Sequence, residues 1–183
     1  MYEGRMDVPD GLRIRRVLEE VYTQVKDTNL EDCAKLNCFL CAKGGAKNCQ
    51  KLHEAVVLLP YELDVLSSLG VRGFPEIEVC GMKIGYVPPH TDCPFNVGGW
   101  CGIHGRHPID CRSFPLVPSI NEAGDLVISI AVGCPAVPTW EFVKLWVEVW
   151  KKLWEVVPES WFRFYSGVPG SPTKPVILIK SLK

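Results

Sequence analysis

The sequence has no hydrophobic stretch long enough to cross a membrane as a helix, which takes about 20 consecutive apolar residues. Its first residues, MYEGRMDVPDGLRIRRVLEEVY, also lack the apolar centre of a secretion signal. We therefore expect a cytoplasmic protein without a membrane partner.

A clear excess of charge of one sign is missing as well. The 183 residues include 20 Lys and Arg against 21 Asp and Glu, which gives a net charge of −1 and a pI of about 6.4. This balance provides no broad basic surface, so we expect no nucleic-acid partner. A protein partner is left open, because no motif identifies one. With 47% hydrophobic residues the chain can bury a core, and its length suits one domain over residues 1–183.

Several familiar enzyme motifs are also absent. The sequence contains no phosphate-binding G-x-x-x-x-G-K-[ST] loop, no dinucleotide-binding glycine fingerprint, no G-x-S-x-G nucleophile turn and no H-E-x-x-H zinc motif. These absences remove the corresponding nucleotide-binding and hydrolytic classes. Whether the protein is an enzyme of another kind stays open.

Cysteine, by contrast, is abundant. In a reducing compartment, clustered cysteines indicate metal binding or catalysis more than disulfides, although disulfides stay open for a hyperthermophilic source. The odd number leaves one cysteine apart, and Cys80 in the strand-like EIEVCGMKIGYV is predicted to be a buried thiol that packs like a small hydrophobic residue. The nine are Cys33, Cys38, Cys41, Cys49, Cys80, Cys93, Cys101, Cys111 and Cys134.

The first cysteine group lies in EDCAKLNCFLCAKGGAKNCQ, residues 31–50. Cys38 and Cys41 form a C-x2-C pair, which lets two sulfurs face one centre from a tight turn and is a common half-site for zinc and iron–sulfur clusters. Cys33 and Cys49 flank the pair. We predict that these four cysteines are metal ligands, and a redox dithiol or plain structural thiols remain the alternatives.

The second group is centred on CPFNVGGWCGIHGRHPIDC, residues 93–111, which repeats at neither a helical nor a strand period. So long a stretch without regular structure needs something else to hold it, and a bound metal would do so. Residues 114–120 and 126–132 are predicted to pair as a hairpin, which would return the following cysteine to the neighbourhood of this stretch. The predicted ligands of this group are Cys93, Cys101, Cys111 and Cys134.

Two further residues of this stretch are candidates for the site. His104, three residues after Cys101, is a candidate additional ligand or a hydrogen-bond donor to a cysteine sulfur. Arg112, next to Cys111, is a candidate donor to a sulfur and offsets negative charge, because four thiolates around Zn²⁺ leave a net charge of about −2.

The remaining segments outline the fold. Residues 12–28 and 139–157 have apolar side chains at helical intervals, and the second of these helices is rich in tryptophan that we expect in the core. Residues 55–59 are predicted to form a strand and residues 71–90 a strand or loose hairpin. Apart from a short final strand, residues 161–183 are predicted to be irregular.

These elements together predict an α+β fold, a small cysteine-rich metal-binding domain with short antiparallel strands. An N-terminal helix over 12–28 precedes the cysteine-cluster core over 31–135. A C-terminal tryptophan-rich amphipathic helix and the tail complete the chain over 139–183.

Several of these motifs resemble the YkgJ-like cysteine-cluster family, whose members are described as zinc- or iron-chelating. The resemblance lies in Cys93-Pro-Phe95, Cys101-Gly-Ile-His104, Cys111-Arg112-Ser-Phe114-Pro115 and Cys134-Pro135, where the spacing from Cys101 to Pro115 fits residue for residue. The family usually has Tyr at His104 and Arg at His107, and its adjacent Cys-Cys pair is missing at Cys49-Gln50. The resemblance implies metal binding and not a particular reaction.

The thiolate ligands favour zinc or iron–sulfur clusters over magnesium or calcium. Wide spacing in loops rich in glycine and proline favours a 4Fe–4S cluster, whose sulfides accept hydrogen bonds from backbone amides, with zinc as the alternative. We therefore expect a metal-binding protein that acts as a redox or interaction module. The alternatives are a cluster-dependent enzyme, for example a protein-modifying transferase, and a purely structural zinc protein.

Overall fold

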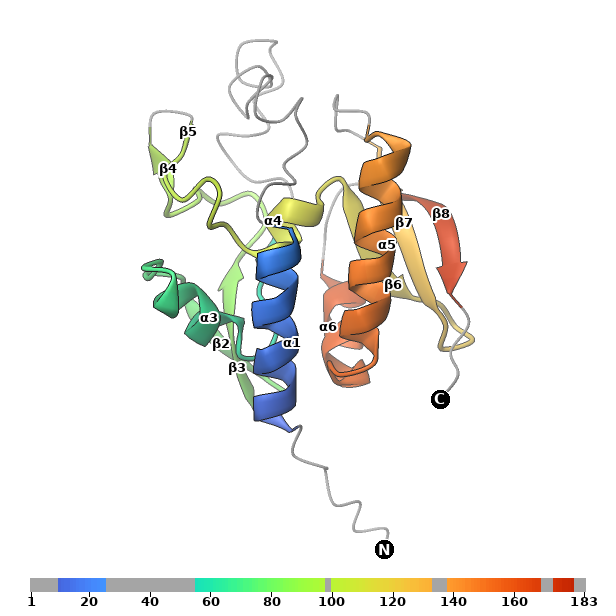
Figure 1. Ribbon diagram of the computed structural model, residues 1–183, viewed down its shortest axis with the longest axis horizontal. Helices are drawn as coiled ribbons and strands as arrows, with labels where there is room; N and C mark the ends of the chain where they lie inside the picture. The colour runs from blue at the N-terminus through green and yellow to red at the C-terminus, as the bar shows by residue number, and fades with distance from the viewer. Residues whose placement is uncertain (1–9, 26–54, 98–99, 133–137, 169–172, 180–183) are drawn as a thin grey trace, which may run out of the picture.

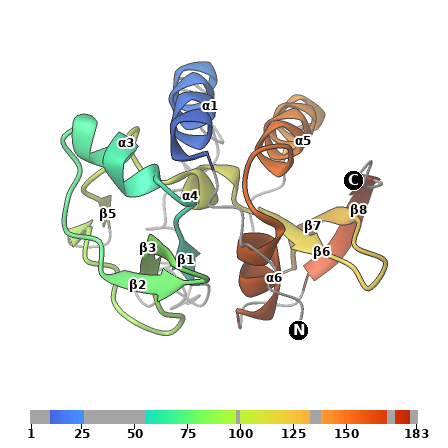
Figure 2. The same ribbon diagram turned by 90° about the horizontal axis from the view of Figure 1, so that it is seen from below.

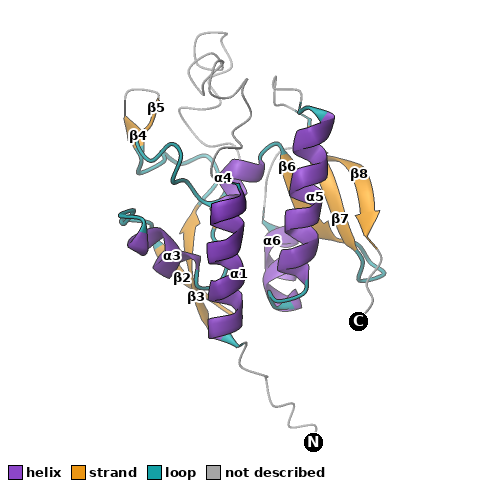
Figure 3. Cartoon of the chain, in the orientation of Figure 1, coloured by secondary structure: helices purple, strands orange, loops and turns teal. Residues whose placement is uncertain are grey.

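The computed structural model describes residues 10–25, 55–97, 100–132, 138–168 and 173–179. Within these ranges the chain forms five helices and three small antiparallel sheets, which confirms the predicted α+β class with short antiparallel strands. Two of the sheets have three strands each, and in Figures 1 and 3 one of these lies on the left and the other on the right. Helices α1 and α5 lie side by side over the same face of the molecule (Figure 2).

Helix α1 spans Gly11–Gln24 and covers the left-hand part of the molecule. Asp10 begins it, because its side chain accepts a hydrogen bond from the Arg13 backbone N–H at 3.3 Å. The helix agrees with the prediction for 12–28 as far as Val25, and residues 26–28 lie outside the described ranges. Its buried side chains are Ile14, Leu18, Val21 and Tyr22.

The left-hand sheet has the strand order β1-β3-β2, with both pairs antiparallel. Its strands are β1 (Val56–Val57), β2 (Glu76–Val79) and β3 (Met82–Val87). Helix α3 (Glu62–Ser68) connects β1 to β2. The segment predicted as a strand or loose hairpin is thus a tight hairpin.

The turn of this hairpin corrects the prediction for Cys80. Val79 pairs with Met82, so Cys80 and Gly81 form a two-residue turn, with φ values of 49° and 76°. The Cys80 side chain is exposed and not buried. The apolar strand pattern suggested burial, but a residue at a hairpin tip has no facing layer to cover it.

The right-hand sheet has the strand order β6-β7-β8. Strands β6 (Leu116–Ile120) and β7 (Leu126–Ala131) form the predicted hairpin, and Ile120 pairs with Leu126 beside the turn. Strand β8 (Thr173–Ile179) adds to β7 and is longer than the short final strand predicted from the sequence.

Two helices pack beside this sheet. Helix α5 (Trp140–Trp154) is the predicted tryptophan-rich helix, and the Thr139 hydroxyl caps it by accepting a hydrogen bond from the Phe142 N–H at 3.2 Å. Helix α6 (Glu159–Gly167) contradicts the prediction of an irregular tail. Pro158 precedes the first turn, where proline is tolerated, and therefore starts a helix instead of breaking one.

The two sides of the molecule are joined through the core. Trp161 of α6 is fully buried and its indole N–H donates to the Leu58 carbonyl, just after β1, at 2.9 Å. On the surface, Lys152 of α5 forms an ion pair with Glu20 of α1 at 2.7 Å. Trp146, Trp150 and Phe162 are also fully buried, so the predicted burial of the α5 tryptophans is correct except for Trp140 at the start of the helix, which is exposed.

The cysteine-rich stretch 93–111, expected to lack regular structure, contains short ordered elements. Strands β4 (Asn96–Val97) and β5 (Trp100–Cys101) pair as a small hairpin. Helix α4 (Ile109–Ser113) ends the stretch and lies between the left-hand and right-hand sheets in both views (Figures 1 and 2). It contacts β1 on one side and β6 on the other.

Candidate functional site

The structure describes five of the ten candidate site residues: Cys93, Cys101, His104, Cys111 and Arg112. The remaining candidates lie outside the described ranges, so the predicted first cysteine group and the predicted return of the last cysteine stay predictions. These remaining candidates are Cys33, Cys38, Cys41, Cys49 and Cys134.

Cys101 lies on β5 of the β4–β5 hairpin, and Cys93 lies in the turn just before β4. The Asn96 N–H donates to the Cys93 carbonyl at 3.0 Å, which bends the chain into β4, and Asn96 pairs with Cys101 across the hairpin. The Phe95 ring packs on Phe74 with 4.5 Å between ring centroids. The hairpin is thereby attached to the left-hand part of the core, with Cys101 on β5 and Cys93 in the turn that leads into β4.

Cys111 lies in α4, and the other residues of this helix make bonds to several surrounding elements. The Ile109 N–H donates to the Glu62 carboxylate at 2.8 Å. The Asp110 carboxylate accepts from the Val57 N–H at 2.8 Å and from the Tyr165 hydroxyl at 2.6 Å. Ser113, which is buried, donates to the Leu116 carbonyl at 3.2 Å. Strand β1 and helices α3 and α6 therefore all hold this short helix.

Glu62 is a fully buried carboxylate that fixes the start of α4. Besides the Ile109 N–H, it accepts hydrogen bonds from the Leu59 N–H at 2.7 Å and the Tyr22 hydroxyl at 2.6 Å. Burial raises the pKa of Glu62, and its three hydrogen bonds oppose that shift. Burial and the neighbouring Glu62 raise the pKa of Tyr22 well above its usual value, so its hydroxyl keeps the proton that it donates.

Arg112 is 4% exposed and directs its guanidinium to backbone carbonyls. Nε donates to the His107 carbonyl at 2.9 Å, Nη1 to the Val25 carbonyl at 3.1 Å, and Nη2 to the Gly105 carbonyl. The guanidinium carbon also lies 5.2 Å from the centroid of the Tyr22 ring. The sequence suggested a donor to a sulfur, whereas these contacts make Arg112 a connector of backbone segments.

The three described cysteines of the second group influence one another. Burial raises the pKa of Cys111 well above its usual value, and negative charge at Asp110, Cys101 and Cys93 raises it further. The Cys111 thiol has no hydrogen bond to any residue that the structure describes. A metal ion that binds this thiol would favour its thiolate form and so oppose the raised pKa.

The donor chemistry of these thiols suits zinc or an iron–sulfur cluster. Within the described ranges, however, no three side chains of Cys, His, Asp or Glu are gathered closely enough to hold a metal ion. The described residues therefore supply neighbouring sulfur donors and not a closed ligand set. The predicted complete set depends on the cysteines outside these ranges.

His104 and His107 stack with 5.1 Å between ring centroids and 15° between ring planes. Nδ1 of His107 accepts a hydrogen bond from the Gly105 N–H at 3.2 Å, which leaves the proton of the neutral ring on Nε2. Burial, Arg112 and His104 lower the pKa of His107 to about 3. This hydrogen bond occupies Nδ1 of His107, whereas His104 is exposed and keeps its place as a candidate.

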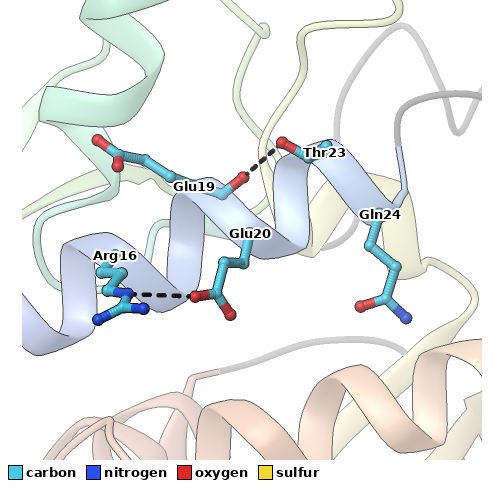
Figure 4. Close-up of a pocket in the computed structure, with 5 residues that line it drawn as sticks. All are labelled: Arg16, Glu19, Glu20, Thr23 and Gln24. Atoms are coloured by element: carbon cyan, nitrogen blue, oxygen red, sulfur yellow. Dashed lines mark hydrogen bonds and ion pairs between the residues drawn. The ribbon is translucent and has the colours of Figure 1, made fainter.

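A shallow polar hollow lies away from the cysteines, on α1 (Figure 4). Two of its side chains, Arg16 and Glu20, form an ion pair at 3.4 Å, and the Thr23 hydroxyl donates to the Glu19 carbonyl at 2.9 Å. None of the described residues that line the hollow is a cysteine or histidine, and we assign it no function.

Sequence reasoning did not identify Glu62, Asp110 and Tyr165 as supports of the site. A signal for Glu62 was available, since this carboxylate shares a helical face with the apolar Val65 and Leu66. A charged residue on a buried face needs polar partners, and here those partners are the backbone of α4 and Tyr22.

Comparisons with known proteins add no assignment. No protein-family model matches the chain, and neither a curated protein nor a solved structure matches it. The resemblance to the YkgJ-like family therefore stays a prediction. Among the described residues, no helix combines the length and apolar character required to span a membrane.

Proposed function

We propose that this protein binds a metal centre through cysteine thiolates, with a 4Fe–4S cluster favoured over zinc. In this proposal Cys93, Cys101 and Cys111 act together with the cysteines of the first group and Cys134. The centre serves as a redox or interaction module, as the YkgJ-like resemblance also implies.

The observation that carries the proposal is the placement of three cysteines in one short region: Cys93 before β4, Cys101 on β5 and Cys111 in α4. Cys93 and Cys111 are separated by a stretch rich in glycine and proline, yet the charges of Cys93 and Cys101 act on the Cys111 thiol. Thiols whose charges act on one another suit a soft cation, because it removes the repulsion between their thiolate forms.

The arrangement of α4 supports the same conclusion. Four of its five residues are fixed by hydrogen bonds, while the remaining one, Cys111, has a thiol without such a bond to any described residue. A ligand must be held in place by its neighbours and still be available to the metal. Cys111 meets both requirements.

The deciding experiment is iron, zinc and acid-labile sulfide analysis of protein purified without oxygen, together with an absorption spectrum. Four irons and four sulfides per chain, with a broad thiolate-to-iron band near roughly 400 nm, are the expected result. One or two zinc ions without sulfide would establish the zinc alternative. Protein without metal and with its cysteines oxidised would contradict the proposal.

Single serine replacements test which cysteines bind the centre. Cys111→Ser should lower the bound metal strongly, because it removes a sulfur that α4 holds in a fixed position. Cys80→Ser is the matched control, since Cys80 is exposed at the β2–β3 turn and is not a proposed ligand. Equal metal content in Cys111→Ser and unchanged protein would remove Cys111 from the ligand set.

A further inference from the structure

The hydrogen bonds of Arg112 connect segments that are far apart in the sequence. Val25 follows the last residue of α1, and its carbonyl is bonded to Arg112 across 87 positions of the chain. Gly105 and His107 lie between Cys101 and Cys111. One side chain therefore ties the end of α1 to the connection between two proposed ligands.

A guanidinium suits this arrangement for a geometric reason. Its N–H groups point outward in one plane and at fixed angles, so three carbonyls that accept from Nε, Nη1 and Nη2 are held in a defined relation to one another. The ammonium group of lysine is a single point and cannot reach all three positions. The buried location of Arg112 adds to the effect, because water does not replace a lost bond there.

We propose that Arg112 is a positioning residue that sets the location of Cys111 relative to Cys101, so that both sulfurs reach the same metal centre. The proposal rests on the proposed function for its metal and adds a role for a residue that is not itself a ligand. Arg112 acts through the backbone carbonyls of Val25, Gly105 and His107.

The first test compares thiol labelling in the metal-free protein. Iodoacetamide labelling of Cys111 is measured by peptide mass spectrometry relative to Cys80, an exposed internal reference far from α4 in the sequence. Arg112→Lys should raise the ratio of the Cys111 rate to the Cys80 rate roughly tenfold, because α4 opens more often. Arg106→Lys is the matched control, since Arg106 belongs to the same connection but is exposed and makes a single bond to the Leu69 carbonyl.

A second pair of variants keeps the proposal testable if Arg112→Lys does not fold. Gly105 and Gly124 have φ values of 81° and 84°, and neither has an atom within 4 Å of an added Cβ. Alanine therefore causes a similar backbone strain at both positions. Only Gly105→Ala should raise the Cys111 labelling ratio, because only the Gly105 carbonyl accepts from Arg112.

The third readout separates positioning from general destabilisation. Arg112→Lys should weaken zinc binding by roughly 10- to 100-fold, the range seen when a residue that supports a metal ligand is replaced. Val149→Ala, a core change in α5, lowers stability without touching α4 and should leave the zinc affinity unchanged. Equal losses of affinity in Arg112→Lys and Val149→Ala would overturn the proposal.

The outcomes for the two proposals can be told apart. If the unchanged protein binds neither zinc nor iron, the proposed function fails, while the labelling ratio still reports whether Arg112 holds Cys111. If the protein binds metal and folded Arg112→Lys keeps both the unchanged labelling ratio and the unchanged affinity, Arg112 has no positioning role.

Discussion

The region around α4 and the aromatic core beside the right-hand sheet are held together in different ways. At α4, buried polar groups such as Glu62 and Arg112 satisfy backbone N–H and carbonyl groups of α4 itself and of three surrounding segments. In the aromatic core, Trp150, Trp161 and Phe162 are fully buried against one another, and ring centroids lie 4.9 to 6.5 Å apart.

The polar partners also differ between the two regions. The indole N–H groups of Trp146 and Trp150 have no hydrogen-bond partner among the described residues, whereas Glu62 accepts three hydrogen bonds. The aromatic core tolerates these indole N–H groups without partners because its stability comes from buried apolar area and close packing. The α4 region depends on hydrogen bonds, whose strength depends on their direction. Small changes of geometry should therefore lower stability more there than in the aromatic core.

The largest effect should follow from opening a cavity in the aromatic core. Phe162→Ala removes a fully buried ring that packs on Trp154 and Trp161, and we expect a loss of roughly 3–5 kcal/mol in the free energy of unfolding. Urea titration measures this loss. Trp140→Ala, at a side chain that is 57% exposed, is the control and should change the same quantity by less than about 0.5 kcal/mol.

A somewhat smaller effect is expected at the polar region from a change of almost no volume. Glu62→Gln places an amide NH₂, which cannot accept a hydrogen bond, opposite N–H and O–H donors. We therefore expect the free energy of unfolding to fall by roughly 2–3 kcal/mol. Glu78→Gln makes the same chemical change on the exposed surface of β2 and should be nearly neutral. Equal stability of the two variants in urea would mean that the hydrogen bonds to Glu62 do not stabilise the α4 region.

The next comparison lies within the aromatic core itself. Trp161→Phe removes the bond to the Leu58 carbonyl, whereas Trp150→Phe removes an indole N–H that has no partner among the described residues. Both side chains are fully buried, so the cavity cost should be similar. We expect Trp161→Phe to be less stable by about 1 kcal/mol, and thermal unfolding of the two variants gives the difference. If Trp150→Phe were the less stable variant, packing and not the hydrogen bond to Leu58 would determine the stability of this core.

The smallest effect should come from the surface pair that joins α1 and α5. Lys152 lowers the pKa of Glu20, so the pair contributes stability above the ordinary pKa of a glutamate and loses it as the pH falls through the lowered value. Glu20→Gln should therefore lower the melting temperature slightly at neutral pH and low salt, and not at all in acid or at about 1 M salt. A difference that persists in high salt would indicate a contact other than charge.

The same contrast explains what could be predicted from the sequence. Helix α5 and the β6–β7 hairpin follow from local periodicity and turn composition, and both were predicted. Helix α6 was not predicted, because the proline and glycine content of the segment around Pro158 and Gly167 indicated an irregular structure. The helical spacing of the aromatic residues Trp161 and Tyr165 was the better signal. Periodicity is a local property, so it finds elements that bury one face.

The supports of the candidate site could not be predicted in this way. The cysteines were visible by residue type and spacing, but the contact of Arg112 with Val25 and that of Tyr22 with Glu62 join positions 87 and 40 residues apart. Such contacts depend on how the elements pack and leave no periodic signal. Cys80 shows that a local pattern can also mislead. It lies in a strand-like sequence but is exposed, because the pattern does not distinguish a strand from the turn that ends it.

The bond from Trp161 to Leu58 also bears on how the chain is made. The two residues are 103 positions apart, so the ribosome releases the left-hand sheet well before it adds the donor for the Leu58 carbonyl. Until α6 emerges, that carbonyl and the apolar surface beside it face water. We therefore expect the N-terminal part to complete its folding only after α6 has been synthesised, which makes chains that lack α6 targets for chaperones and proteases.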